Sequence, residues 1–380
     1  MPRRTIENPD SFATLAGMST HAARVAVIGA SGYGGAELAR LLASHPHAEL
    51  TIATASGERA GAALSDLFPS LRGVCDIVCE EFDAGKISES CDFVFIALPH
   101  GKAMSMVPPL LERGLKVCDI GADFRLRDVD VFETWYKMPH AAPDTLRHAV
   151  YGLPEWNRAR IQQAQLVANP GCYPTSAILA LSPLVASGAI ELNSIIVDGA
   201  SGTSGAGRAS FGLGLHHPEM NGDFKAYNVA SHRHTPEIEQ GLQDAAGSVD
   251  IGGPHMSTHV APITFTAHLL PIARGILSTC YASLKQELSA TQVHEIMANT
   301  YAGEPFVRVL AVGQMPQIKH VAGSNFCDLG VVVDARTNRA IVVAAIDNLV
   351  KGAAGQAIQN MNLMCGLDET DGLKSAPLFP

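Results

Sequence analysis

The chain has 380 residues, of which 47% are hydrophobic and 17% are charged, and its formal net charge is −10 at pH 7. This length predicts two domains, and the acidic balance, without a local stripe of lysine and arginine, argues against a nucleic-acid-binding surface. No apolar run reaches the roughly 18 residues that span a bilayer, so we expect small-molecule partners and neither nucleic acid nor membrane.

The eight cysteines show no regular disulfide spacing. Cys75 and Cys79 lack the second pair that a structural zinc site would need. We therefore expect reduced thiols, a cytoplasmic location and no bound metal. Residues 1–22 mix Arg3 and Arg4 with acidic residues and contain no apolar signal core, so they are predicted to form a disordered extension.

Folded structure is predicted to begin with an apolar strand over residues 24–29, followed by a glycine turn and a helix over 36–44. The turn has the spacing GxxGxGG, and its candidate cofactor residues are Gly29, Ser31, Gly32, Tyr33, Gly34 and Gly35. Glycines let the backbone approach a pyrophosphate, and a helix N-terminus favours its negative charge. An ordinary turn is the alternative, but the flanking strand and helix favour a dinucleotide site.

The second predicted strand, residues 49–54, indicates which dinucleotide binds. An NAD site usually carries an acid about 20 residues after the glycine turn to hold the ribose hydroxyls. Here Ser56 and Arg59 follow the strand, and a hydroxyl and a guanidinium suit a 2′-phosphate. We therefore predict NADP(H) in preference to NAD(H), with a solvated loop charge as the alternative interpretation of Arg59.

Further alternation continues with a strand over 91–98, a turn at Pro99 and His100, a helix over 102–113 and a strand over 116–120. This order predicts an α/β fold with a doubly wound, parallel, Rossmann-type sheet. Ligands bind at the carboxyl ends of such strands, which places Leu98 and Pro99 near the cofactor. His100 is more simply read as a turn residue than as a chemical group.

Cys172 stands between two prolines in the stretch Asn-Pro-Gly-Cys-Tyr-Pro-Thr-Ser over residues 169–176. A helix is predicted to start just behind it, over 176–185. Because a helix N-terminus lowers the pKa of a thiol and the thiolate is the nucleophilic form, Cys172 is the candidate nucleophile.

The second half of the chain predicts an α+β domain built on a mixed sheet. A strand is expected over 194–198, and apolar runs follow over 261–270, 330–334 and 340–345. A long helix over 347–365 is expected to return to the first domain. The expected domains are residues 23–168 with 346–380 for the dinucleotide, and 169–345 for catalysis, substrate and oligomerisation.

Two polar clusters follow the cysteine. A glycine-serine loop is expected over 199–207, and its Ser201 and Ser204 with the following Arg208 could cradle an anion, with a flexible surface loop as the alternative. The segment over 231–237 holds His232 and His234, and no partner at a suitable spacing supports a zinc site, so an acid–base role is preferred. In an extended segment both histidines share a face with Arg233 pointing away, but spacing does not choose between them.

Eight motifs in chain order resemble those of the N-acetyl-gamma-glutamyl-phosphate reductases over residues 24–367: GASGYGG, ALPHG, GADFRL, YGLPE, NPGCYPTS, DGASGTSGAGR, HRHTPEI and DNLVKGAAGQAIQNMN. This family is similar to the aspartate-semialdehyde dehydrogenases. The resemblance implies NADPH-dependent reduction of N-acetyl-L-glutamyl 5-phosphate to the 5-semialdehyde, with loss of phosphate, through a cysteine thioester in arginine biosynthesis. It also implies a homodimer or homotetramer.

By the same resemblance, the nucleophile is Cys172 and the acid–base residue is His234. Asn348 matches the residue near the nicotinamide amide. The candidates for substrate binding are Arg125, Ser201, Ser204, Arg208 and His232. The alternative substrates are aspartyl phosphate and carrier-bound N-acetyl-aminoadipyl phosphate. An alternative from a different class of function is a redox-sensing regulator that uses Cys172 as its sensor. A cysteine hydrolase is a further alternative, but it would not explain the predicted dinucleotide-binding domain.

Overall fold

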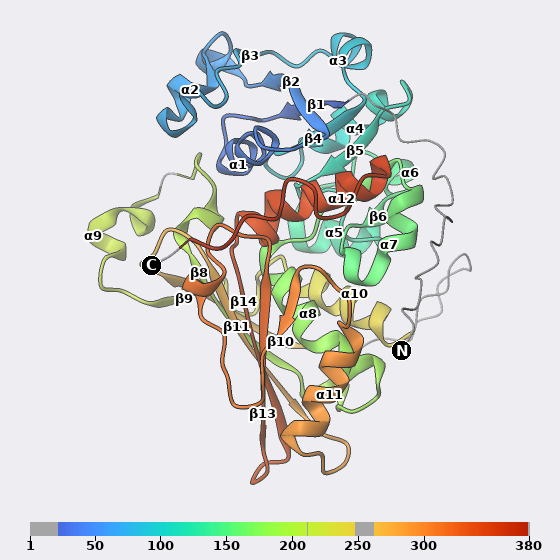
Figure 1. The fold of residues 1–380 in the computed structure, drawn as a ribbon, viewed down its shortest axis with the longest axis vertical. Coiled ribbons are helices and arrows are strands. Elements are labelled where there is room, and N and C mark those ends of the chain that lie inside the picture. The colour runs from blue at the N-terminus through green and yellow to red at the C-terminus, as the bar shows by residue number, and fades with distance from the viewer. Residues whose placement is uncertain (1–21, 211, 248–261, 379–380) are drawn as a thin grey trace, which may run out of the picture.

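The computed structural model describes residues 22–210, 212–247 and 262–378 (Figure 1). The extension expected over residues 1–22 lies outside the described residues, apart from residue 22 itself. Two sheets stand one above the other in Figure 1, and each forms the centre of one half of the molecule. Among the described helices, none combines the length and apolarity needed to cross a membrane.

The first sheet has seven strands in the order β3-β2-β1-β4-β5-β7-β6, and all neighbours run parallel, which confirms the doubly wound arrangement. Its inner strands are apolar and buried on both faces, as a sheet covered by helices requires. The strands are β1 Ala23–Ile28, β2 Ala48–Thr54, β3 Cys79–Glu80, β4 Phe93–Ile96, β5 Lys116–Asp119, β6 Val150–Tyr151 and β7 Leu166–Ala168.

The helices of this half cover both faces of its sheet. One face packs on α1 and on the C-terminal helix α12, while the other packs on α3, α4 and α5. The helices are α1 Tyr33–Leu42, α2 Leu64–Leu67, α3 Ala84–Ser90, α4 Ala103–Leu111, α5 Val129–Tyr136, α6 Pro143–Leu146 and α7 Pro154–Gln163, with 3₁₀ turns at Gly57–Arg59 and Pro69–Leu71.

The second sheet is mixed, as expected, with seven strands in the order β12-β13-β14-β11-β8-β10-β9. The pairs β8–β10 and β12–β13 are parallel, and the remaining neighbours are antiparallel. The strands are β8 Ile196–Gly202, β9 Lys225–Tyr227, β10 Thr264–Leu270, β11 Ile276–Ser283, β12 Val307–Val309, β13 Cys327–Asp334 and β14 Arg339–Ile346.

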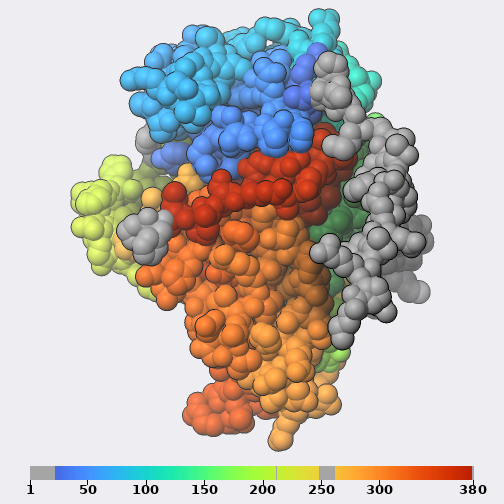
Figure 2. All heavy atoms as spheres, viewed as in Figure 1, coloured from blue at the N-terminus to red at the C-terminus, as the bar shows by residue number. Residues whose placement is uncertain are grey.

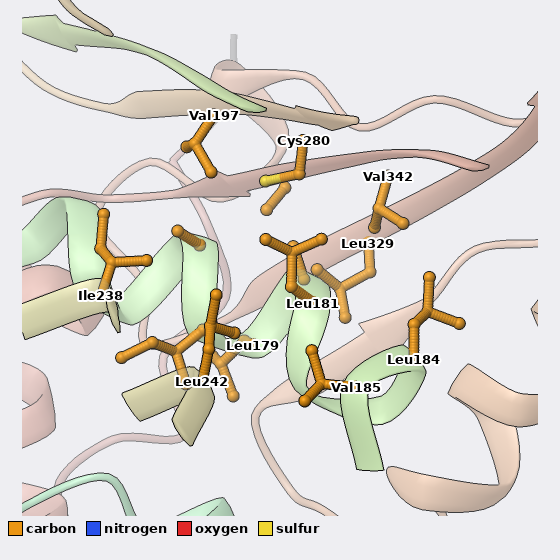
Figure 3. Packing of buried hydrophobic residues seen from close by; sticks show 14 of the residues in the cluster. Leu179, Leu181, Leu184, Val185, Val197, Ile238, Leu242, Cys280, Leu329 and Val342 are labelled. Atoms are coloured by element: carbon orange, nitrogen blue, oxygen red, sulfur yellow. The ribbon is translucent and has the colours of Figure 1, made fainter. Parts of the chain in front are cut away.

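One face of the mixed sheet is covered by α8, which α10 and α11 flank. In Figure 3, Leu181 of α8 points toward Cys280 of β11 and Val342 of β14, and Ile238 and Leu242 bring α10 against the same core. The helices and 3₁₀ turns of this half are α8 Cys172–Ala186, α9 His217–Met220, α10 Thr235–Ala245, α11 Ala290–Thr300, Leu192–Ser194, Thr203–Ala206, Leu213–Leu215 and Ile318–His320.

The C-terminal helix α12, Gly355–Cys365, lies between the two halves, as its red ribbon and red atoms show (Figures 1 and 2). Its buried amides bind backbone of the first half: Gln356 Nε2 and Asn360 Nδ2 each donate to the Gly152 carbonyl at 2.8 Å. Asn360 Nδ2 also lies 3.0 Å from Oδ1 of Asn169, just before the cysteine. The helix therefore fixes the loop before Cys172 to the first sheet.

The expected long helix over 347–365 is interrupted at its start. A π-helical segment, Val350–Ala354, precedes α12, with Gly352 N–H donating to the Asp347 carbonyl five residues back. Such segments widen a helix locally and are frequent at functional sites. Here the wider turn brings Gly352 against Cys172, where a Cβ on the glycine would approach the cysteine Cβ to 2.8 Å.

Two other predicted boundaries were wrong. Helix α1 begins at Tyr33, so Gly34 and Gly35 belong to its first turn and not to the glycine turn. The glycine-serine stretch expected as a loop over 199–207 continues β8 to Gly202 and then forms a 3₁₀ turn. Gly199 of this strand leaves room for the ring of Tyr173, because a Cβ at this position would lie 2.6 Å from the ring.

Candidate active site

Cys172 is the first residue of α8, directly after the loop that leaves the carboxyl end of β7. The helix therefore starts four residues earlier than predicted. Pro174 is tolerated because the first N–H groups of a helix have no intrahelical partner. Gly171 caps the helix without a side chain, which leaves its N-terminal N–H groups facing the thiol. This is the placement that the sequence predicted for a nucleophile.

His234 lies against Gly171, the residue directly before Cys172. A Cβ on Gly171 would come within 2.5 Å of Nε2 of His234 and 2.8 Å of Nη1 of Arg125. Only a glycine leaves room for both side chains at this point. The structure therefore places the two predicted catalytic residues, Cys172 and His234, next to Gly171.

His232 supports His234. The two rings have centroids 4.8 Å apart, and Nδ1 of His232 accepts the backbone N–H of His234 at 3.1 Å. Arg233 points the other way, with Nη1 2.9 Å from Nε2 of His100. The histidines thus share a side as expected, although they lie in a turn that leads into α10 and not in an extended strand. The other neighbours of His232 are the rings of Tyr173, Tyr227 and Phe265, so its geometry is that of a residue that orients His234 and not that of a substrate-binding residue.

The thiol and the imidazole are both neutral in the resting site. Burial raises the pKa of the Cys172 thiol to about 11, with Arg125 and the backbone N–H groups of Tyr173 and Cys172 acting in the opposite direction. The expectation of a lowered thiol pKa was therefore wrong for this state, because desolvation outweighs the helix terminus. Burial, with His232, Arg125 and Arg233, holds the pKa of His234 well below its usual range.

Arg125 reaches the site but does not offer a free guanidinium. Its Nε donates to the Asn169 carbonyl and its Nη2 to the Ile120 carbonyl, both at 2.8 Å. Its Nη1 lies 3.3 Å from Oε2 of Glu237, and the pair is buried. Sequence reasoning assigned Arg125 to the substrate and passed over Glu237, although an acid three residues after His234 in the same helical turn was a usable signal.

The other predicted substrate residues lie farther along β8 and beyond it. Ser201 is buried and donates to the Gly202 carbonyl, while Ser204 lies 2.9 Å from Nδ2 of Asn348. Asn348 Oδ1 accepts the N–H of Gly275 at 2.7 Å, so its amide bridges two loops. Arg208 lies beyond the end of β8 and reaches the first half of the molecule, where its Nη1 donates to the Ser31 carbonyl at 3.0 Å.

Two of the predicted substrate residues, Ser204 and Arg208, line a cavity between the two halves. It measures about 440 Å³, and Tyr33, Ser204, Arg208, Arg274 and Leu349 are among its lining residues. Its wall therefore combines the start of α1 with the 3₁₀ turn after β8. Ligands of open α/β sheets bind at such a junction beyond the strand ends.

The glycine turn fits a dinucleotide. Gly29 adopts φ +87°, and a Cβ there would come within 2.5 Å of the Ala97 carbonyl and 2.8 Å of the Leu98 side chain. On Gly35 it would meet the Gly29 carbonyl at 2.4 Å. Gly32 caps α1 without any side-chain partner, so the first N–H groups of this helix are available to an anion.

Ser56 and Arg59, the residues predicted to hold the 2′-phosphate, follow the carboxyl end of β2. Both are exposed, and Arg59 belongs to the 3₁₀ turn Gly57–Arg59. Pro99 is exposed beyond β4, at the same edge of the sheet. Among the described residues, no group of three His, Cys, Asp or Glu side chains could hold a metal ion.

Two families match this chain. The semialdehyde dehydrogenase NAD binding domain matches residues 24–164, and the semialdehyde dehydrogenase dimerisation domain matches residues 172–348. An N-acetyl-gamma-glutamyl-phosphate reductase of Pelotomaculum thermopropionicum is 53% identical over 94% of this chain and 100% of its own. One of Geobacter sp. strain M21 is 52% identical over 94% of this chain and 99% of its own.

Solved structures with the same fold are more distant in sequence. Aspartate semialdehyde dehydrogenase II of Vibrio cholerae, complexed with ASA, has a TM-score of 0.66 at 17% identity, covering 91% of this chain and 99% of its own. Aspartate semialdehyde dehydrogenase of Candida albicans with NADP has a TM-score of 0.66 at 17% identity, covering 90% and 98%.

Proposed function

The chain belongs to the N-acetyl-gamma-glutamyl-phosphate reductases of the semialdehyde dehydrogenase family, and we propose that Cys172 and His234 carry its reaction. The activity is the reduction of N-acetyl-L-glutamyl 5-phosphate to the 5-semialdehyde in arginine biosynthesis. The observation that supports the two residues is the packing of Nε2 of His234 against Gly171, next to the nucleophile.

The first step forms a thioester on the cysteine. A neutral imidazole beside a neutral thiol can accept the thiol proton as sulfur attacks the acyl carbon. The carbon–sulfur bond forms, the carbon–oxygen bond to phosphate breaks, and phosphate leaves with the bonding electrons. The N–H groups of Cys172 and Tyr173 stabilise the negative charge that develops on the sulfur.

The second step reduces the thioester carbonyl. When bound, NADPH supplies the hydride. The imidazolium of His234 gives its proton to the carbonyl oxygen, which prevents an oxyanion from accumulating and yields a thiohemiacetal. His234 then takes that proton back as the carbon–sulfur bond breaks, which releases the aldehyde, and returns it to the Cys172 thiolate. Each proton thus moves between the same nitrogen and the two reacting atoms.

NADP(H) is the proposed cofactor within the NAD(P)-binding fold. The residues that would hold it are the glycine turn Gly29–Gly35, Leu98 and Pro99, with Ser56 and Arg59 at the 2′-phosphate. Arg59 supports NADP(H) because its guanidinium, like the hydroxyl of Ser56, is exposed beyond the end of β2. Asn348 is proposed to lie near the nicotinamide amide, because its side chain bonds Ser204 and its chain neighbour Leu349 lines the cavity.

The substrate is proposed to bind at the junction between the halves, where Ser204 and Arg208 line the cavity. Arg125 and His232 contribute by setting the charge and the direction of His234. Ser201 has a buried hydroxyl and shapes the strand end. We further propose the division into residues 23–168 with 346–380 and residues 169–345, which agrees with the packing of α12 on the first sheet.

The dimerisation domain indicates a homo-oligomer, and we propose a homodimer or homotetramer. Alternate residues of β11, including Leu277, Thr279 and Tyr281, lie on the sheet face opposite α8 and are only half-buried in one chain. All eight cysteines are free, in keeping with a cytoplasmic location.

The function is tested by running the reaction in reverse with N-acetylglutamate semialdehyde, phosphate and either NADP or NAD, and following the absorbance of the reduced cofactor. We expect phosphate-dependent reduction of NADP. Reduction with aspartate semialdehyde at equal efficiency, or no dependence on phosphate, would contradict the assignment.

A further inference from the structure

The buried carboxylate of Glu237 joins three parts of the active site. It lies in the first turn of α10 and is 1% exposed. Its Oε1 accepts the phenol of Tyr151 at 2.9 Å and the backbone N–H of Gly171 at 2.8 Å, and its Oε2 faces Nη1 of Arg125 at 3.3 Å. Charge-assisted hydrogen bonds from three directions fix the carboxylate in one position.

Arg125 links the carboxylate of Glu237 to the imidazole of His234. Nη1 of Arg125 lies between Oε2 of Glu237 and Nε2 of His234, at 3.3 and 3.4 Å. Its other nitrogens are held by the carbonyls of Asn169 and Ile120, so the guanidinium cannot swing away. Without the carboxylate, a buried positive charge would face the imidazole alone.

The helix that bears Glu237 is itself held rigidly. Ile238 and Leu242 pack its apolar face on α8 (Figure 3). On its other side, Gln240 Nε2 donates to the Arg125 carbonyl at 2.9 Å, and Asp244 pairs with Arg127 at 2.6 Å. The well-packed helix α10 thus holds the Glu237 carboxylate against the backbone N–H of Gly171, as precise positioning requires.

We propose that Glu237 is a positioning residue of this reductase, which holds the Gly171–Cys172 peptide against His234 and balances the charge of Arg125. The inference rests on the proposed roles of Cys172 and His234. The charge and the side-chain length of Glu237 have separate consequences. Loss of the negative charge changes the ionisation of the Cys172 thiol and the His234 imidazole. A shorter side chain changes only the positions of these groups.

The charge part has a defined sign. Arg125 lowers the pKa of the Cys172 thiol and Glu237 raises it. The phenols of Tyr173 and Tyr227 also act on the thiol, and burial raises the pKa of each. His232 and His234 pack on the ring of Tyr173, and burial lowers the pKa of each. Behind Gly352, Lys351 is already paired with Glu155 at 2.6 Å. Removing only the charge of Glu237 therefore leaves Arg125 uncompensated and should make the thiol ionise at lower pH.

The test compares Glu237→Gln, which keeps the shape and loses the charge, with Glu237→Asp, which keeps the charge and loses the reach. Glu239→Gln is the matched control, because Glu239 lies two residues along the same helix and accepts the N–H of Ile263, away from Gly171 and Arg125. For each full-length variant, the pH dependence of alkylation of the Cys172 peptide by iodoacetamide is measured by mass spectrometry, together with kcat, KM and NADPH binding.

We expect Glu237→Gln to shift the alkylation profile to lower pH and to lower kcat on the order of a hundredfold. Glu237→Asp should lower kcat while the alkylation profile stays in place, and the control should change neither. An unchanged alkylation profile and unchanged kcat in Glu237→Gln would overturn the proposal. If that variant does not fold, Glu237→Asp decides: a normal kcat overturns the positioning role, and a lowered kcat with an unmoved profile supports it.

These outcomes are separate from a failure of the proposed function. Alkylation reports the surroundings of Cys172 whether or not it is the nucleophile. Turnover by Cys172→Ser would refute the nucleophile itself, while leaving the shift of the alkylation profile in Glu237→Gln as a property of the network.

Discussion

The imidazole of His234 lies so close to Gly171 that a Cβ on the glycine would approach Nε2 to 2.5 Å. Gly171 also donates its N–H to Glu237 and caps the helix that starts with Cys172. Cys172 and His234, the proposed nucleophile and acid–base residue, are therefore both neighbours of Gly171, which has no side chain. Several consequences of this contact can be measured.

Gly171→Ala should disable the chemistry without removing the cofactor site. The new methyl group must push His234 or Arg125 away, and displacement of a catalytic group by about 1 Å can cost on the order of a hundredfold in rate. We expect kcat to fall by that order with NADPH binding unchanged. Gly85→Ala on α3 is the control, because its Cβ would meet only the Asp83 side chain, at 3.2 Å. Normal turnover by Gly171→Ala would contradict the packing.

His234→Asn should lower kcat by about 10²–10⁴, the usual contribution of general acid–base catalysis. His232→Asn should have a smaller effect, because His232 acts only by accepting the N–H of His234 through Nδ1. Both variants are compared by kcat under saturating substrate. Equal, small losses in the two variants would remove His234 from the mechanism.

Gly35→Ala should weaken dinucleotide binding, because its methyl group would sit 2.4 Å from the Gly29 carbonyl and open the turn. Gly85→Ala on α3 is again the control, because Gly85 lies outside the glycine turn and its Cβ would meet only the Asp83 side chain, at 3.2 Å. Titration of each protein with NADPH, followed by fluorescence, measures the difference. Similar dissociation constants for both variants would show that the turn does not cradle the cofactor.

Arg59→Ala should change the choice between cofactors. If the guanidinium contacts the 2′-phosphate, its loss should raise the KM for NADP by about tenfold, corresponding to about 1.4 kcal/mol, and leave the KM for NAD unchanged. Glu58→Gln, at the adjacent exposed position, serves as the comparison. A parallel change in both KM values would assign Arg59 to the loop surface.

Much of the fold followed from local pattern. Buried apolar strands such as Phe93–Ile96, each followed by a glycine turn or a helix, predicted the parallel sheet, and the expectation was confirmed. The end of β8 could not be predicted in this way. Its Gly199 and Ser201 have low strand propensity, and they lie in the strand because β10 and β11 pair with it on both sides and Tyr173 packs on Gly199.

The parts of the site that depend on residue type alone could be predicted from the sequence. A cysteine between Gly171 and Tyr173 and a pair of closely spaced histidines indicated a nucleophile and a base. The ionisation of Cys172 was predicted wrongly, because burial depends on the whole fold and here exceeds the effect of the helix terminus. The fixed position of Arg125 likewise depends on carbonyls of distant segments and on Glu237.

Replacement of Cys172 by serine tests the central claim most directly. Turnover is measured by phosphate-dependent reduction of NADP with N-acetylglutamate semialdehyde, and NADPH binding is titrated in the same preparation. The proposed mechanism predicts loss of turnover with cofactor binding intact, because a serine hydroxyl beside a neutral imidazole is a far weaker nucleophile and forms an ester in place of the thioester. Near-normal turnover by Cys172→Ser would contradict the mechanism.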